Sequence, residues 1–124
     1  MSDPERPFVV ESGVARLLAS LEKETGLYFF PPIPRSSPQV DRFKVVRLAS
    51  EAILYSHTTI YASVRAEKPP VTLVYADFPE GVRVLGRLKG SGSGRVRIGD
   101  SLRIELETQA DGSLGYVFSP SHGV

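Results

Sequence analysis

VTLVYADFPEGVRVLGRL, residues 71–88, holds two short apolar runs separated by Pro79, Glu80 and Gly81. Both runs are rich in β-branched residues, which fit a pleated and half-buried surface. A proline followed by a glycine two positions later is typical of a tight turn. The stretch therefore predicts two strands, 71–78 and 82–88, joined by a turn.

The same pattern extends to both sides of this stretch. Further strands are predicted over residues 43–48, 52–61, 102–107 and 114–118. Leu102, Ile104 and Leu106 alternate with charged residues, which indicates a strand with one buried face in an antiparallel sheet. Strands this few and this short suit a small closed barrel. We expect a mainly β protein with an OB-like antiparallel barrel over residues 42–120 and a tail over 121–124.

The N-terminal part has a different pattern. Its apolar residues recur at helical spacing and are Val14, Leu17, Leu18 and Leu21. Ser12 is placed to cap a helix, and Gly26 is placed to end it. Four prolines then favour an extended connector over residues 31–41. The sequence thus predicts one α-helix ahead of the barrel.

The overall composition excludes several classes of protein. Fifteen Lys and Arg against fourteen Asp and Glu give a net charge of +1, so no global field attracts nucleic acid or an anionic membrane. The chain has no cysteine, which excludes disulfides and thiolate metal sites. No apolar run is long enough to span a bilayer, and the N-terminus lacks a signal-peptide core. We expect a cytoplasmic location.

An ordered series of motifs resembles a known family. It comprises residues 71–88, the Ile98-Gly99 step with Leu102 after it, and the closing Tyr116-Val-Phe-Ser-Pro120. The series is similar to the acyl-CoA-associated OB-fold proteins. That resemblance implies an N-terminal helix, a rubredoxin-like zinc ribbon and a C-terminal OB barrel. It also implies a non-catalytic accessory subunit that binds a thiolase-like enzyme, an aldolase or an acyltransferase, and that helps to bind acyl-CoA.

The ribbon of this family departs from its usual form here. Its four zinc-ligand positions would fall on Glu22, Thr25, Ser37 and Val40, of which only the first is a good zinc ligand. We therefore predict no zinc and no other cofactor. Residues 1–41 would form the helix and a degenerate, metal-free ribbon-like arm, held by the aromatic residues at positions 28–30.

Basic residues gather around the Gly/Ser stretch 90–94. Candidate contacts to CoA or another anion are Arg83, Arg87, Lys89, Arg95 and Arg97. Guanidinium groups pair with phosphate oxygens, although alternating arginines are also typical of a solvated sheet face. A second interpretation is an OB barrel that binds single-stranded nucleic acid, which the near-neutral charge disfavours.

The N-terminal part carries much apolar surface. Candidate contacts to a partner are Leu17, Leu21, Tyr28, Phe29, Phe30 and Arg35. They either pack across the barrel or form an interface, where aromatics and arginine are favoured. No catalytic residue is predicted, since His57 stands alone on a strand and His122 lies near the end of the chain.

Overall fold

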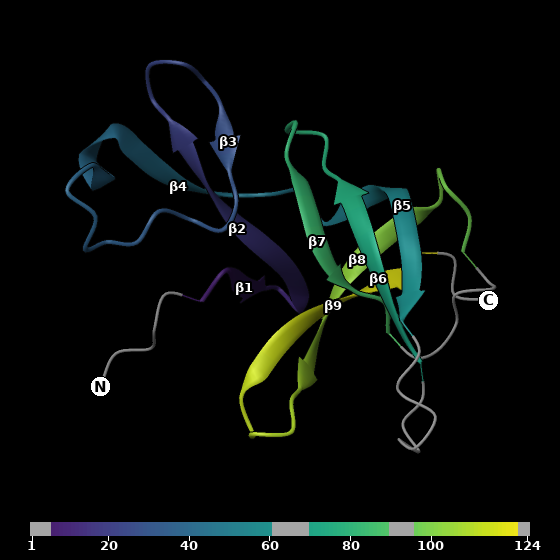
Figure 1. Cartoon of the computed structure of the whole chain (residues 1–124). Helices are drawn as coiled ribbons and strands as arrows, with labels where there is room; N and C mark the ends of the chain where they lie inside the picture. Colours follow the sequence, from purple (N-terminus) through teal and green to yellow (C-terminus); the bar gives the residue numbers. More distant parts are fainter. Residues whose placement is uncertain (1–5, 61–69, 90–95, 122–124) are drawn as a thin grey trace.

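The computed structural model describes residues 6–60, 70–89 and 96–121, which form two β-sheets (Figure 1). The strands are β1 Phe8–Glu11, β2 Val14–Glu22, β3 Tyr28–Phe29, β4 Phe43–Arg47, β5 Glu51–Ile60, β6 Val71–Asp77, β7 Arg83–Arg87, β8 Ser101–Thr108 and β9 Leu114–Pro120. A 3-10 helix, η1, covers Val40–Arg42. In the described part of the chain, no helix is long and apolar enough to cross a membrane.

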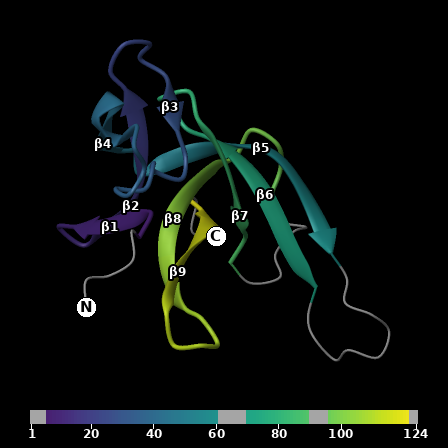
Figure 2. The same ribbon diagram turned by 60° about the vertical axis from the view of Figure 1, so that its left-hand side comes forward.

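The five strands β7-β6-β5-β8-β9 form the barrel, and each pairs with its neighbour antiparallel. The sheet curls until its two ends meet (Figure 2). There Leu88 forms a parallel bridge to Phe118, and the Lys89 N–H donates to the Phe118 carbonyl at 2.8 Å. Five strands closed in this way form the OB-like barrel that the sequence predicted.

A bulge in β5 allows the sheet to curl. The register of β5 against β6 shifts between Leu54 and Ser56, and the residues before the shift, from Glu51 to Ile53, also pair with β8. A β-bulge bends its strand and increases the local twist. One strand therefore turns from one wall of the barrel to the next while Leu54 stays fully buried.

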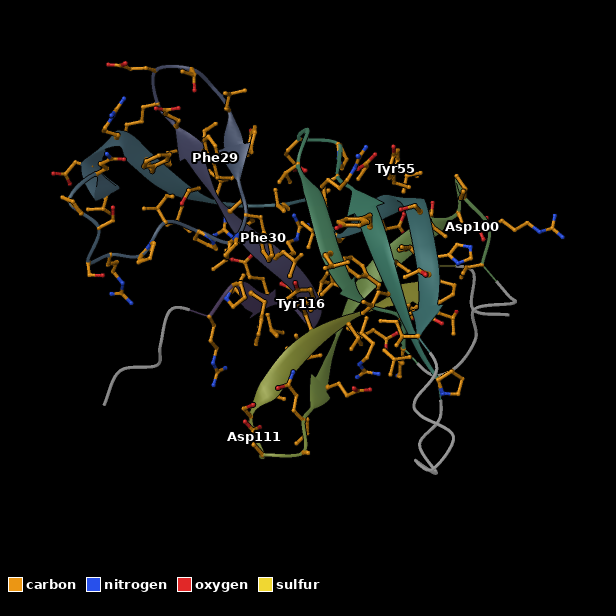
Figure 3. The ribbon with its side chains drawn as sticks, in the orientation of Figure 1. Phe29, Phe30, Tyr55, Asp100, Asp111 and Tyr116 are labelled. Carbon is orange, nitrogen blue, oxygen red and sulfur yellow. The ribbon has the colours of Figure 1, made fainter. Side chains whose placement is uncertain are left out.

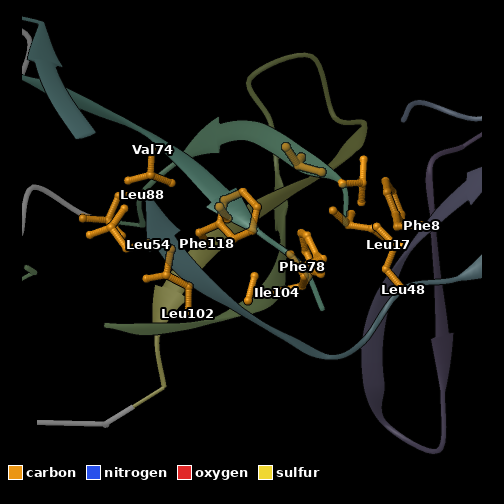
Figure 4. Close-up of a cluster of buried hydrophobic side chains, with 14 of the residues drawn as sticks. Phe8, Leu17, Leu48, Leu54, Val74, Phe78, Leu88, Leu102, Ile104 and Phe118 are labelled. Carbon is orange, nitrogen blue, oxygen red and sulfur yellow. The ribbon is translucent and has the colours of Figure 1, made fainter. Parts of the chain in front are cut away.

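The hydrophobic core fills the barrel and continues beyond it. Phe118 is completely buried at its centre, against Phe78 at a ring distance of 6.3 Å (Figure 4). Toward the N-terminal strands the same cluster includes Phe8, Leu17 and Leu48. The two sheets therefore share one continuous apolar interior.

Gly86 on β7 leaves room for the Phe118 ring. A Cβ at this position would lie 2.5 Å from Phe118 Cε2 and 3.1 Å from Tyr116 Cε2. We expect Gly86→Ala to lower the free energy of unfolding by about 1–3 kcal/mol, because the ring must shift in a filled core. Urea denaturation measures this loss. Gly115→Ala is the control, because there only the flexible Gln109 side chain has to move. Equal stability of Gly86→Ala and wild type would contradict the packing described.

Strands β1 to β4 form a second unit, the N-terminal sheet. The long β2 pairs with β1 along its first half and with β3 and β4 along its second half. Residues 43–47, which the sequence placed at the start of the barrel, thus pair with β2 as β4. Leu48, Ala49 and Ser50 connect this sheet to the barrel.

The predicted helix over Val14–Leu21 is wrong, because this segment is strand β2. Ser12 and Gly13 have φ values of +51° and +78°, and they form the two-residue turn between β1 and β2. Positive φ at both positions is typical of a hairpin turn and unlike a helix cap. Leu17 and Ala19 are both fully buried and Leu18 between them is only half-buried, which fits the alternation of a strand.

Candidate functional site

The exposed side of the N-terminal sheet carries an aromatic pair. The Phe29 and Phe43 rings meet edge to face at 5.8 Å, and Phe29 remains 39% exposed. Val45 lies on the same face, because Phe29 and Val45 both pair with Ser20 on β2, and it is 60% exposed. We call Phe29, Phe43 and Val45 the outer apolar face. Exposed aromatics of this kind are enriched at protein interfaces.

Phe30 points the other way, toward the barrel. Its ring meets the Tyr116 ring edge to face at 6.0 Å where the two sheets come together (Figure 3). The Tyr116 hydroxyl donates to the Leu85 carbonyl at 3.0 Å, and burial raises the pKa of this phenol. Of the aromatic residues 28–30, which the sequence predicted to hold the N-terminal segment, Phe30 and the half-buried Tyr28 pack on the core.

A pocket of about 480 Å³ opens beside this junction. Phe30 and Pro31 line it from the N-terminal side, and Tyr75, Leu85 and Tyr116 line it from the barrel. Apolar walls with a few polar groups, at the junction of two units, are typical of binding sites. The pocket is thus lined both by residues that follow β3 and by residues of the barrel.

Arg83 borders this pocket and is fixed in place. Its Nε donates to Asp77 Oδ1 at 2.6 Å and its Nη2 to Asp77 Oδ2 at 3.1 Å. Its Cζ also lies 3.4 Å from the centre of the exposed Tyr55 ring. The hydrogen bonds to Asp77 raise the pKa of Arg83. The guanidinium is therefore preorganised, and its charge is neutralised by Asp77.

Two other basic residues of the predicted anion site form ion pairs between strands of the barrel. Arg87 forms an ion pair with Glu107, and Lys89 Nζ lies 2.7 Å from Glu105 Oε1. These pairs join the end of β7 to β8 across β9. Val117 of β9 pairs with Glu105 and is only 3% exposed. We call these two ion pairs the β9 clasp.

Glu105 is the centre of this clasp, since Arg103 Nη2 also donates to its Oε2 at 2.9 Å. The hydrogen bond from Lys89 is the main cause of the lowered pKa of Glu105, and Arg103 adds to it. A carboxyl whose pKa is lower in the folded state stabilises the fold above its unfolded pKa of about 4.3. This stabilisation is lost as the pH falls through the folded pKa.

We expect Glu105→Gln to lower the free energy of unfolding by about 1 kcal/mol at pH 7, a value reduced by solvent screening. The difference from wild type should shrink as the pH is lowered from 7 through the folded pKa of Glu105, because the wild-type carboxyl then becomes protonated and loses its interactions with Lys89 and Arg103. Glu51→Gln, at an exposed position on β5, is the control. A difference that stays constant as the pH falls from 7 through the acid range would rule out this role of Glu105.

The remaining predicted anion contacts are Arg95 and Arg97. Arg95 lies outside the described residues. Arg97 is exposed in the turn before β8, where its backbone N–H donates to Asp100 Oδ2 at 2.9 Å. Of the described cations, Arg83, Arg87 and Lys89 thus each contact a carboxylate, and the CoA site that the five residues would form stays a prediction.

The residues predicted to contact a partner differ in their exposure. Leu17 is fully buried inside the chain and belongs to the core, so it presents no surface to a partner. Leu21 and Tyr28 are paired neighbours on β2 and β3 and are half-buried. Phe29 and Arg35 are exposed. The sequence pattern did not identify Phe43 and Val45 as members of the outer apolar face, because it placed residues 43–48 in the barrel.

Polar contacts surround the four positions where the resemblance would place zinc ligands. Thr25 Oγ1 donates to Glu22 Oε1 at 2.8 Å, and Arg42 Nη2 lies 3.4 Å from Glu22 Oε2. Lys23 Nζ donates to the Asp41 carbonyl at 3.0 Å. Within the described ranges, no group of three or more His, Cys, Asp or Glu residues is arranged to hold a metal ion. Side-chain hydrogen bonds thus connect this part of the N-terminal sheet.

Comparisons with known proteins give three similarities. A family described as "ChsH2, C-terminal OB-fold domain" matches residues 45–107. The benzoylsuccinyl-CoA thiolase subunit BbsA of Thauera aromatica is 30% identical over 94 residues, which are 75% of this chain and 65% of that protein. The chain thus spans slightly less than two thirds of that relative's length. In the solved structure of the Ltp2-ChsH2(DUF35) aldolase, a chain with 19% identity aligns at a TM-score of 0.66, over 86% of this chain and 85% of that one. The last likeness shows the fold.

Proposed function

The chain belongs to the family of the ChsH2 C-terminal OB-fold domain, and on this premise we propose that it is a non-catalytic accessory subunit of a thiolase-like or aldolase enzyme. Membership agrees with the acyl-CoA-associated OB-fold family that the ordered motifs indicated. The observation that carries the proposal is the similarity to a protein named as a thiolase subunit. The name of the structure with the same fold, the Ltp2-ChsH2(DUF35) aldolase, agrees with it.

The contacts of the acidic side chains support a non-catalytic role. Asp77 is bound to Arg83, Glu105 to Lys89 and Arg103, and Asp100 caps its own turn through the Arg97 N–H. A general acid or base needs free access to a substrate proton. Each of these carboxylates instead holds strands or turns together.

The outer apolar face supports a protein partner. Phe29, Phe43 and Val45 lie on one side of the N-terminal sheet, and the opposite side of that sheet packs on the barrel core through Leu17 and Ala19. Clusters of exposed apolar side chains mark interaction sites. We propose that the enzyme partner covers this face.

We further propose that this chain contacts acyl-CoA only when it is assembled with its enzyme partner. In the isolated chain Arg83, Arg87 and Lys89 each contact a carboxylate. We therefore expect calorimetry to detect no CoA binding by the chain alone. The complex should bind acyl-CoA more tightly than the enzyme partner does alone. If the complex and the enzyme alone bind acyl-CoA with equal affinity, this chain binds the enzyme but does not contribute to the acyl-CoA site.

The test is to co-express the chain with a thiolase-like or aldolase protein from the same organism and to assay both separately and together. The proposal predicts no turnover of acyl-CoA by this chain alone and a higher activity or stability of the enzyme when the chain is present. An enzyme that is equally active and equally stable without the chain would overturn the proposed role. Turnover by the purified chain would overturn its non-catalytic part.

A further inference from the structure

Glu80 of the β6–β7 turn reaches out of the barrel to the connection between the two sheets. Its Oε2 accepts a hydrogen bond at 3.0 Å from the backbone N–H of Ala49, which is 31 residues away in the sequence. Ala49 lies between β4 of the N-terminal sheet and β5 of the barrel. One side chain of the barrel thus holds the connecting segment directly.

The turn itself does not need this carboxylate. The Gly81 N–H donates to the Phe78 carbonyl and the Phe78 N–H to the Val82 carbonyl, both at 2.9 Å, so backbone groups close it. Gly81 also supplies the positive φ, +98°, that such a turn requires. The Glu80 side chain is therefore available for a contact elsewhere.

The Glu80 carboxylate is held in an unfavourable environment. Its Oε1 is buried and has no hydrogen-bond partner among the described residues. Withdrawing a charged oxygen from water without a partner destabilises the fold. The Ala49 N–H is thus the donor that this carboxylate has among the described residues.

The connection is held on its other side as well. The N–H of Leu48, a fully buried residue, donates to the Leu17 carbonyl of β2 at 2.8 Å. Successive backbone groups thus bind to the N-terminal sheet at Leu48 and to the barrel at Ala49. The connecting segment is thus hydrogen-bonded to both units.

We propose that Glu80 is a positioning residue, which holds the N-terminal sheet at one angle on the barrel so that a partner meets both units in a fixed arrangement. The expected effect of Glu80 on binding rests on the proposed function. The structural part of the proposal, the fixed angle, stands independently of any partner.

The first experiment measures the angle between the sheets in the full chain. Because the chain has no cysteine, spin labels can be placed at Lys44→Cys on β4 and Thr108→Cys on β8, both exposed. Electron paramagnetic resonance then gives the distribution of distances between them. We expect Glu80→Ala to broaden this distribution and Glu80→Gln to restore it, since a glutamine oxygen can accept the same N–H. Glu80→Asp, with a shorter reach, should behave like alanine and serves if the alanine variant does not fold. A distribution unchanged in the folded alanine or aspartate variant overturns the proposal.

The second experiment measures binding to the purified thiolase-like partner. Glu80→Ala should weaken binding about tenfold while Glu80→Gln binds like wild type, because only a fraction of the loosened chains has the competent angle. Glu51→Ala, at an exposed position on β5, is the control and should change neither readout. Failure of wild type to bind would contradict the proposed function, and the distance distribution would then decide the structural role of Glu80. Binding by Glu80→Ala equal to wild type, alongside a broadened distribution, would contradict the role of the angle in recognition.

Discussion

Phe118→Ala is expected to lower the free energy of unfolding by about 3–5 kcal/mol, the range for removing a buried aromatic ring. Phe118 is completely buried, and its ring contacts those of Phe78 and Tyr116 at 6.3 and 6.0 Å. Its backbone also closes the barrel through Leu88 and Lys89. A loss of this size is comparable to the whole stability of many small domains.

Urea denaturation followed by circular dichroism measures this effect. Phe118→Leu should lose clearly less, because it keeps most of the apolar volume. Phe29→Ala removes the same ring from an exposed position and should cost below about 1 kcal/mol. Similar losses for the two alanine variants would mean that the barrel core is not centred on Phe118.

Phe29→Ala is expected to weaken binding to the thiolase-like partner at least about tenfold, which is the effect of losing an interface aromatic. The reason is the place of Phe29 on the outer apolar face, where it packs edge to face on Phe43 and is 39% exposed. Burial of this ring by a partner would release the water bound to its exposed part. Biolayer interferometry with the purified enzyme gives the dissociation constant.

The matched control is Leu114→Ala at the start of β9. Leu114 is 43% exposed, slightly more than Phe29, but it belongs to the β8–β9 hairpin, which lies away from β3 and Phe29 (Figures 1 and 3). Its replacement should leave the dissociation constant unchanged. A larger effect from Leu114→Ala than from Phe29→Ala would move the interface from the N-terminal sheet to the barrel.

The strands of the barrel could be predicted because their signals are local. The alternation of Leu102, Ile104 and Leu106 with charged residues needs no knowledge of the rest of the chain, and strand β8 covers it at Ser101–Thr108. The turn at Pro79 and Gly81 likewise joins β6 and β7 as expected. The predicted strand boundaries differ from the observed ones by only one or two residues.

The helix prediction failed because two periods fit the same residues. Val14, Leu17, Leu18 and Leu21 match a helical face, but Leu17 and Leu21 also belong to an alternating set completed by Ala15 and Ala19. The alanines gave a weak signal for a buried strand face. Ser12 followed by Gly13 was the local clue to a hairpin turn, since a cap and a turn both favour serine and glycine.

The ion partners of the basic residues could not be predicted. Arg87 and Lys89 contact Glu107 and Glu105, which lie within twenty positions of them in the sequence. These side chains meet only because the barrel closes around β9. The hydrogen bond between Glu80 and Ala49 is likewise a consequence of tertiary structure. Contacts of this kind follow from topology, which a sequence pattern does not specify.

Light scattering on a size-exclusion column tests the central claim most directly. The chain is mixed with the purified thiolase-like or aldolase protein of its own organism, and the mass of each peak is measured. An accessory subunit predicts one peak whose mass is the sum of both proteins in a fixed ratio, and Phe29→Ala reduces that peak at low concentration. Two separate peaks at every concentration, with each protein folded, would contradict the account.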